Sequence, residues 1–206
     1  MTEIELTVFV VDDDHDIRTA LSRSLRKRGY QVESHDCAES FLQGYDGRRA
    51  GCLVLDYGMP GMTGLELQAH LAGMDCPLAV IFITGHGGVP ESVQAIKQGA
   101  IDFLEKPFRQ AVLLERIEAG FDLIRQKLQT CRKERQAAAL FDRLTARERE
   151  IVDRMVENPS AISSKEIGAR LGISPRTVDH HRARILEKLQ MKSVAEVIAH
   201  ARHQRG

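Results

Sequence analysis

The chain has 206 residues, of which 43% are hydrophobic and 28% are charged, as in an ordinary globular protein. Its length predicts two domains of unequal size. The longest apolar run, residues 78–83, is too short to cross a bilayer, and Glu3 and Glu5 stand where a signal peptide needs positive charge. We therefore expect a cytoplasmic protein without a membrane partner.

Charge is divided unevenly along the chain although the net charge is zero. Residues 1–125 carry 12 basic and 19 acidic side chains, whereas residues 126–206 carry 17 basic and 10 acidic ones. The acidic half suits metal or phosphate chemistry, and the basic half suits a polyanion. The cysteines form neither a C-x-x-C pair nor a cluster with histidine, so structural thiols are expected at Cys37, Cys52, Cys76 and Cys131.

In the first half, short apolar runs alternate with segments of helical period, which is typical of a parallel sheet with helices on both faces. The predicted strands are Leu6–Val11, Tyr30–Ser34, Cys52–Leu55, Ala79–Thr84 and Ile101–Leu104. The predicted helices cover residues 15–28, 38–44, 64–73, 89–98 and 108–122, with Gly29 and Gly99 at two of the C-terminal ends. We expect an α/β doubly wound, flavodoxin-like domain with strand order 2-1-3-4-5.

Polar residues follow four of these strands. They are Asp12, Asp13 and Asp14 after the first strand, Asp56 after the third, Thr84 closing the fourth, and Lys106 after the fifth. An aspartate after a strand is commonly a helix N-cap, which is the role expected of Asp14 or Asp16. Capping does not explain acids, a hydroxyl and a lysine gathered at one edge of a sheet. Clustered carboxylates need a cation, and an all-oxygen site suits Mg²⁺, or Mn²⁺ in its place.

Such a site has a specific chemistry. A carboxylate can attack phosphorus and form an acyl phosphate, provided that a metal ion and a lysine neutralise the phosphoryl oxygens. Thr84 and Lys106 are the groups expected to bind the new phosphate.

Four runs in this half resemble the receiver domains of two-component response regulators: VVDDD at 10–14, LVLDYGMPGMTG at 53–64, FITGH at 82–86 and AIDFLEKPF at 100–108. The resemblance implies that Asp56 is the phosphoacceptor and that a sensor histidine kinase supplies the phosphate. It also implies a metal site formed by Asp12, Asp13, Asp56 and the backbone carbonyl of Gly58.

The same resemblance implies a cis peptide before Pro107 and a switch role for Phe103, for which plain core packing is the alternative. Gly58 and His86 depart from the commonest pattern of the family. Both positions flank the route of the attacking water, so the lifetime of the acyl phosphate depends on them.

Beyond Ala137 the strand signals stop and helix starts recur. Thr145, Ser163 and Ser193 each precede a glutamate by three positions, as in a capping box, and Ser174-Pro175 marks a further start. The predicted helices cover residues 146–157, 164–171, 175–189 and 194–203. A short turn containing Gly172 separates the second from the third, which is the sequence form of a helix-turn-helix.

The helix at 175–189 is the candidate DNA reader. Val178, Ile185 and Leu189 recur on one face and are expected in the core. The candidate DNA contacts are Arg176, Thr177, Asp179, His180, Arg182, Ala183, Arg184 and Lys188. A basic helix can be merely a solvated surface, but the turn, the caps and the basic balance of this half favour DNA.

This half resembles the LuxR-type output domain of NarL/FixJ response regulators through LTAREREIV at 144–152, KEIGARLGISPRTVDHHRARILEKL at 165–189 and KSVAEVIAHA at 192–201. The resemblance implies a small all-α four-helix domain whose third helix enters the major groove of double-stranded DNA, with RNA polymerase as a further partner. The connection ENPSAISSKE at 157–166 is longer than usual. We expect a receiver at 1–122, a helical linker at 123–140 and the DNA-binding domain at 141–206.

The leading interpretation is a phosphorylation-activated transcriptional regulator that is no enzyme beyond its own Mg²⁺-dependent phosphorylation and dephosphorylation. A phosphorelay intermediate is the first alternative, and the DNA-binding half disfavours it. A phosphorylation-independent dimeric DNA-binding regulator is the second, and the intact set of acids, threonine and lysine disfavours it.

Apolar residues running out of the last receiver helix alternate steps of three and four: Leu114, Ile117, Phe121, Ile124, Leu128 and Cys131. This spacing predicts that the helix continues into the linker and forms the seam of a weak coiled coil. The alternative is that the first of these residues pack on the sheet. We expect a homodimer to form on phosphorylation.

Overall fold

The computed structural model describes residues 5–203, apart from residues 75, 86–88 and 161. The chain divides into two compact units, Met1–Leu128 and Gln129–Gly206. Every helix in the described part of the chain is too short or too polar to span a membrane.

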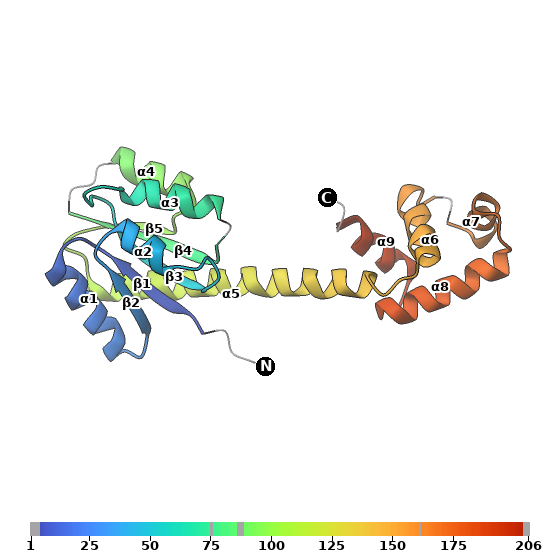
Figure 1. Ribbon diagram of the computed structural model, residues 1–206, viewed down its shortest axis with the longest axis horizontal. Helices are drawn as coiled ribbons and strands as arrows, with labels where there is room; N and C mark the ends of the chain where they lie inside the picture. The colour runs from blue at the N-terminus through green and yellow to red at the C-terminus, as the bar shows by residue number, and fades with distance from the viewer. Residues whose placement is uncertain (1–4, 75, 86–88, 161, 204–206) are drawn as a thin grey trace. The chain divides into compact units, whose positions relative to one another are not determined.

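The first unit is built on a five-stranded parallel sheet in the order β2-β1-β3-β4-β5 (Figure 1). Its strands are β1 (Thr7–Val11), β2 (Gln31–His35), β3 (Gly51–Asp56), β4 (Leu78–Thr84) and β5 (Asp102–Glu105). Its helices are α1 (His15–Lys27), α2 (Ala38–Gly44), α3 (Gly64–Gly73), α4 (Val89–Lys97) and α5 (Gln110–Phe141). The predicted fold class and strand order are confirmed.

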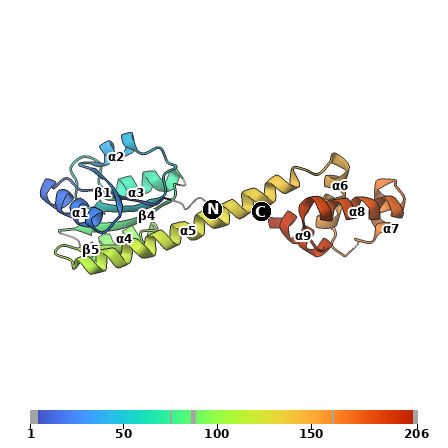
Figure 2. The ribbon, with the colours of Figure 1, turned by 90° about the horizontal axis from the view of Figure 1, so that it is seen from below.

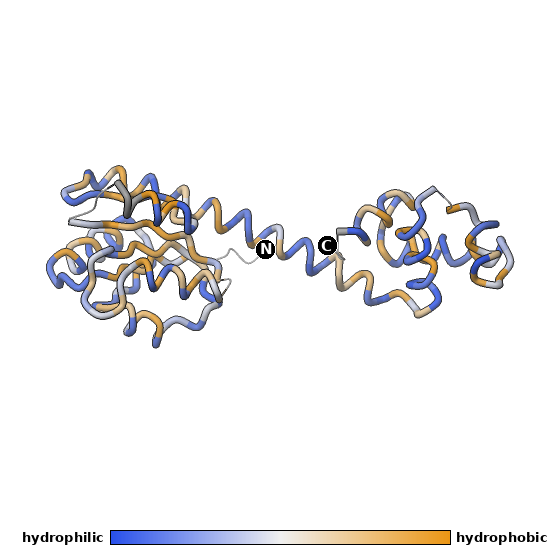
Figure 3. Tube along the Cα trace, turned by 90° about the horizontal axis from the view of Figure 1, so that it is seen from above, coloured by the Kyte–Doolittle hydropathy of each residue, from blue (hydrophilic) through white to orange (hydrophobic). Residues whose placement is uncertain are grey.

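The two faces of the sheet are covered by different helices because successive strand residues point to opposite sides. On β3, Cys52 and Val54 belong to the core cluster that includes α1 and α5, whereas Leu53 and Leu55 belong to the cluster that includes α2, α3 and α4. Figure 2 shows the same helices from below, and Figure 3 colours the central strands as largely hydrophobic. Burial on both faces explains why these strands are continuous apolar runs.

Several local predictions are confirmed at the helix ends. The side chain of Asp14 caps α1 by accepting hydrogen bonds from the backbone N–H groups of Asp16 at 2.9 Å and Ile17 at 3.1 Å. Gly29 and Gly99 follow α1 and α4 with φ values of +90° and +94°, in the left-handed region that glycine adopts most readily.

Helix α5 continues unbroken to Phe141, so the predicted extension into the linker is confirmed. The predicted coiled-coil seam is wrong as far as Leu128. Ile117, Phe121 and Ile124 are at most 5% exposed within the core of the first unit, and Leu114 and Leu128 pack against that core. Side chains buried against their own sheet are not free to form a seam with a second chain.

The second unit contains the four helices predicted for it: α6 (Ala146–Glu157), α7 (Ser164–Leu171), α8 (Pro175–Leu189) and α9 (Val194–His203). Two of the three predicted capping boxes are complete, at Thr145 and Ser163. At Ser193 only half of the box forms, because the Glu196 carboxylate accepts its hydrogen bond from the N–H of Lys192 and not from that of Ser193. The long connection after α6 includes residue 161, which lies outside the described residues.

Gly64, at the start of α3, has no room for a side chain. A Cβ there would lie 2.5 Å from the backbone oxygen of Asp56 and 2.8 Å from Cε1 of Phe82. We predict that Gly64→Ala lowers the free energy of unfolding of the first unit by about 1–3 kcal/mol, because overpacking forces the backbone to shift. Urea denaturation followed by tyrosine fluorescence measures this, since all three tyrosines lie in the first unit.

The matched control is Gly73→Ala at the other end of α3, where a Cβ meets nothing within 4 Å. It should leave the stability unchanged or raise it, because alanine restricts the unfolded chain. Equal losses in the two variants would contradict the close approach of α3 to β3.

Candidate functional site

The sheet register brings the carboxyl ends of β1, β3, β4 and β5 to one edge. Asp12 follows β1, Asp56 is the last residue of β3, Thr84 ends β4 and Lys106 follows β5. Asp12 is 0% exposed, Thr84 2% and Asp56 6%. The structure therefore places four of the expected site residues at one edge, with three of them almost completely buried.

Lys106 bridges the two carboxylates. Its Nζ lies 2.9 Å from Oδ2 of Asp12 and 2.7 Å from Oδ1 of Asp56. The backbone N–H of Lys106 donates to the carbonyl of Thr84 at 2.7 Å, and the Lys106–Pro107 peptide is cis, as the family resemblance implied. These backbone contacts fix the point from which the lysine side chain reaches across β4 to β3 and β1.

Burial and charge act against each other in this cluster. Burial raises the pKa of Asp12 above its ordinary value, and the hydrogen bond and charge of Lys106 oppose that rise only in part. Burial by itself lowers the pKa of Lys106, but its hydrogen bonds to Asp56 and Asp12 outweigh burial and raise the pKa. Lys106 is therefore held firmly in its charged form.

The remaining oxygen of each carboxylate accepts a backbone N–H group from the residue two positions further along the chain. Oδ1 of Asp12 accepts the N–H of Asp14 at 2.9 Å, and Oδ2 of Asp56 accepts the N–H of Gly58 at 2.8 Å. The loop after Asp56 is held by the Tyr57 N–H, which donates to the carbonyl of Ile83 at 2.9 Å. Asp56 is thus oriented from both sides while a small part of it stays accessible.

Asp13 lies beside this cluster with an exposed side chain. The guanidinium of Arg18 donates to the backbone carbonyls of Asp12 at 2.7 Å and Asp13 at 3.3 Å, so α1 fixes the loop that carries both acids. Among the described residues, no three His, Cys, Asp or Glu side chains are gathered closely enough to hold a metal ion. The oxygen donors nevertheless have the chemistry that Mg²⁺ prefers.

The candidate switch residues are placed as follows. Phe103 is half-buried on β5, with its ring centroid 5.8 Å from that of Tyr57 and 6.0 Å from that of Phe82. This packing is what a core phenylalanine would also show, so the switch role stays a prediction. Thr84 is buried next to Lys106, and His86 lies outside the described residues.

In the second unit, α7 and α8 form a helix-turn-helix whose turn depends on glycine. Gly172 follows α7 with φ +67°, and a Cβ on Gly168 would lie 2.7 Å from the backbone oxygen of Ile173. The hydroxyl of Ser174 caps α8 by accepting the N–H of Thr177 at 3.1 Å. The core face of α8 is confirmed, since at most 2% of each side chain is exposed at Val178, Ile185 and Leu189.

Of the candidate DNA contacts, six are exposed: Arg176, Thr177, Asp179, His180, Ala183 and Arg184. Arg182 is half-buried and donates from Nη1 to the hydroxyl of Ser164 at 3.0 Å, and that hydroxyl donates to the carboxylate of Asp179. Ser164 thus joins α7 to two reading residues. Sequence reasoning missed it because its partners lie 15 and 18 positions away.

Lys188, one of the candidate DNA contacts, also has a partner within its own unit. Its Nζ lies 2.5 Å from Oε2 of Glu148, which is 1% exposed. Burial alone would raise the pKa of Glu148, but the hydrogen bonds from Lys188 and from the Thr145 N–H outweigh it and lower this pKa. The local sequence indicated Glu148 only as a capping residue, because Lys188 is 40 positions away.

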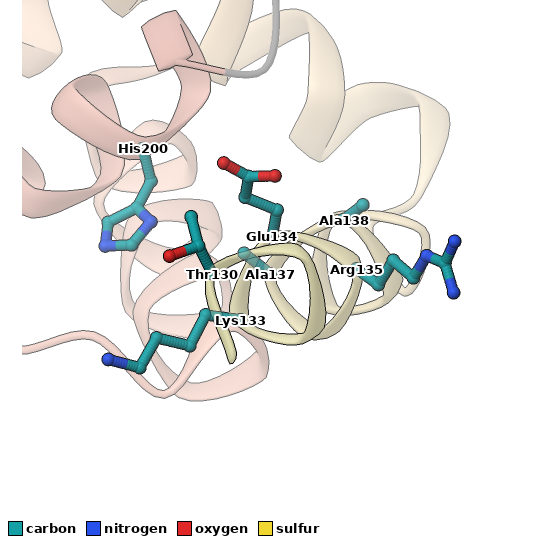
Figure 4. Close-up of a pocket in the computed structure, with 7 residues that line it drawn as sticks. All are labelled: Thr130, Lys133, Glu134, Arg135, Ala137, Ala138 and His200. Carbon is teal, nitrogen blue, oxygen red and sulfur yellow. The ribbon is translucent and has the colours of Figure 1, made fainter. Parts of the chain in front are cut away.

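A cavity of about 690 Å³ is formed within the second unit. Figure 4 shows that residues of α5, including Thr130 and Glu134, line it together with His200 of α9. It contains none of the acidic residues at the sheet edge and none of the candidate DNA contacts.

Comparisons with known proteins identify both units. The model for the response regulator receiver domain matches residues 8–118, and the model for bacterial regulatory proteins of the luxR family matches residues 142–201. The transcriptional regulatory protein FixJ of Rhizobium meliloti (strain 1021) is 37% identical over 194 residues, which cover 94% of each chain. The chain belongs to the NarL/FixJ family of response regulators.

Other members of the family agree. The transcriptional regulatory protein TdiR of Thauera aromatica is 38% identical over 192 residues, covering 93% of this chain and 83% of TdiR. The structure of the response regulator StyR has a TM-score of 0.83 at 40% identity and covers 97% of this chain and 99% of StyR. Full-length FixJ from B. japonicum has a TM-score of 0.59 at 33% identity, with 98% of each chain covered.

Membership establishes the general function of this response regulator. It is a DNA-binding transcriptional regulator of a two-component system that phosphorylation activates, as the sequence predicted. A receiver implies a sensor kinase as partner, and receiver domains generally bind Mg²⁺ at the phosphorylation site.

The Glu148–Lys188 pair leads to a stability prediction. Lys188→Met should lower the free energy of unfolding of the second unit by about 3 kcal/mol, because it leaves a buried carboxylate without its cation. Native-state amide hydrogen exchange in α8 measures the loss. Lys192→Met removes an exposed lysine with no ion pair among the described residues, and this control should change the stability by about 0.5 kcal/mol or less.

The difference between Lys188→Met and the parent should also depend on pH. Because the pKa of Glu148 is lowered in the folded state, the stabilisation is complete above its ordinary value of 4.5 and is lost as the pH falls through the lowered value. A difference that stays constant through acid pH would mean that Lys188 stabilises α8 by packing alone.

Proposed function

We propose that Asp56 is the residue of this response regulator that accepts the phosphoryl group. The observation that carries the proposal is the sharing of Lys106 by Asp56 and Asp12. Asp12 is 0% exposed whereas Asp56 is 6% exposed, and Asp13 is exposed but has no lysine partner among the described residues. Asp56 alone among the three combines contact with the lysine and access to a donor.

In this proposal an oxygen of Asp56 attacks the phosphorus of a phosphohistidine on a sensor histidine kinase. The P–N bond breaks as the P–O bond of the acyl phosphate forms, and the histidine leaves as a neutral imidazole after taking one proton from solvent. Lys106, whose Nζ is 2.7 Å from Oδ1 of Asp56, binds the incoming phosphoryl oxygens together with the hydroxyl of Thr84.

A divalent cation completes the proposed site. Asp12, Asp13, Asp56 and the backbone carbonyl of Gly58 would hold Mg²⁺ or Mn²⁺. When bound, the ion supplies positive charge to the phosphoryl oxygens. We propose no catalytic activity beyond this self-phosphorylation and the later hydrolysis, which Gly58 and His86 would influence.

In the second unit, α8 enters the major groove of double-stranded DNA, and RNA polymerase is a further partner in the cytoplasm. Three exposed candidates form no ion pair with any described residue: Arg176, His180 and Arg184. Asp179 and Arg182 read DNA from positions that Ser164 fixes.

We also propose that phosphorylation produces a homodimer, formed through the first unit and not through a coil along α5. Helix α4 exposes two large apolar side chains next to Lys97, with Val93 44% and Ile96 46% exposed. Exposed apolar neighbours of this kind are typical of interaction surfaces. Phosphoryl binding by Thr84 and repacking of Phe103 would change this surface.

The first test is labelling by acetyl phosphate with Mg²⁺, measured by intact mass. The parent should gain one phosphoryl group, and Asp56→Asn and Lys106→Met should reduce labelling at least tenfold. Asp16→Asn, which removes an exposed carboxylate from the first turn of α1, should label normally. Full labelling of Asp56→Asn, or labelling that persists in chelator, would show that another residue is the acceptor.

DNA binding should depend strongly on salt because phosphate contacts release counterions. We predict that Arg184→Gln weakens binding to specific and random DNA alike and reduces the salt slope by about one, whereas His180→Ala changes sequence preference. Titrations of the phosphorylated chain at several salt concentrations measure both. The control is Arg202→Gln, which removes one positive charge from α9. If Arg202→Gln weakened DNA binding as much as Arg184→Gln does, the assignment of α8 to the major groove would be wrong.

Sedimentation with and without beryllofluoride, a phosphate mimic, tests the dimer. The mimic should convert monomer to dimer in the parent and not in Ile96→Asp. A dimer of equal strength in both states would favour the phosphorylation-independent regulator.

A further inference from the structure

A cavity with a largely polar lining lies in the receiver unit, between α1, β2 and the start of α2. Its volume is about 480 Å³, within the range of small-ligand sites. None of the groups at the edge formed by β1, β3 and β5, namely Asp12, Asp56 and Lys106, belongs to its lining. The phosphorylation chemistry of Asp56 therefore does not account for it.

The wall of this cavity is positively charged. Arg18 and Arg26 donate only to main-chain carbonyls and to the ring of His15, and Arg23 has no hydrogen bond or ion pair among the described residues. Against these three guanidinium groups, the described lining contains one acid, Asp36. This excess lies on the acidic half of the chain, where residues 1–125 carry 12 basic and 19 acidic side chains.

One lining group is buried without a partner. Ser22 is 3% exposed, and its hydroxyl oxygen makes no hydrogen bond with any described residue. Buried hydroxyls in folded proteins nearly always have a partner, so an orphan at the wall of a cavity requires an explanation. One explanation is a ligand that accepts a hydrogen bond from this hydroxyl.

We propose that this cavity binds a small phosphorylated anion, of the class of a diphosphate ester, through Arg23, Arg18 and the hydroxyl of Ser22. Guanidinium groups suit this ligand because their planar N–H donors match pairs of phosphate oxygens. The three arginines supply charge, and Ser22 supplies the neutral donor that fixes orientation.

Arg18 connects this site to the loop that follows β1 at the phosphorylation site. The same guanidinium donates to the backbone carbonyls of Asp12 and Asp13, so an anion that draws Arg18 toward the cavity competes with those contacts. Coupling of this kind is reciprocal between the two sites.

The test is titration of the full chain carrying Asp56→Asn, in chelator, with inorganic pyrophosphate and with ADP, followed by amide chemical shifts. The substitution and the chelator suppress phosphate binding at the sheet edge. The proposal expects saturable shifts at residues of α1 and β2, and at least tenfold weaker binding in Arg23→Gln and in Ser22→Ala. Arg48→Gln removes an exposed arginine outside the cavity and should bind as the parent does.

Shifts that do not saturate, or equal weakening in Arg48→Gln, would mean general attraction of counterions and would overturn the proposal. A stability measurement separates the ligand role of Ser22 from a structural one. Without anion, Ser22→Ala should melt at the same temperature as the parent or higher, because the lost hydroxyl had no partner. A clearly lower melting temperature would assign the hydroxyl to the fold and overturn its role in binding.

Discussion

The ammonium group of Lys106, held between Asp12 and Asp56, is the interaction on which the receiver site depends. Two carboxylates this deeply buried would repel each other and lose their hydration, and the lysine offsets a part of both costs. The three residues come from the ends of β5, β1 and β3, and the order β2-β1-β3-β4-β5 brings these ends close enough for one lysine to contact both acids. The sheet order makes the cluster possible, and the cluster in turn ties the sheet edge together.

Local chemistry made much of this architecture predictable from the sequence. Some residues act only on neighbours within one helical turn, such as Asp14 at the start of α1 and Gly29 after its end. The structural role of such a residue can be predicted from its type and its position alone. The alternation of strands and helices indicated the class of fold because the central strands β1, β3 and β4 are buried on both faces and are therefore apolar runs, whereas the edge strand β2 is partly exposed. The edge of the sheet followed, since residues after parallel strands must share it.

What the sequence did not reveal depends on packing between distant segments. The apolar residues along α5 do recur in steps of three and four. This periodicity does not say whether Ile117 and Phe121 pack on a sheet or on a second helix, and in the structure they pack on the sheet. The bonds from Ser164 to α8 and from Glu148 to Lys188 join helices whose relative placement no local pattern encodes. The buried hydroxyl of Ser22 likewise looks in the sequence like one more polar residue of α1.

The ion pairs of the second unit change how its positive charge should be counted. Arg147, Arg149, Arg154 and Lys188 each pair with an acid of the same unit. Pairing leaves the net charge of the unit unchanged, but it reduces the number of cationic side chains that are free to contact a DNA backbone, and Arg176 and Arg184 are among those that remain. Each paired cation is held by its acid at a fixed place on the surface, so the ion pairs that stabilise the helices also select which cationic side chains are left to move toward a polyanion.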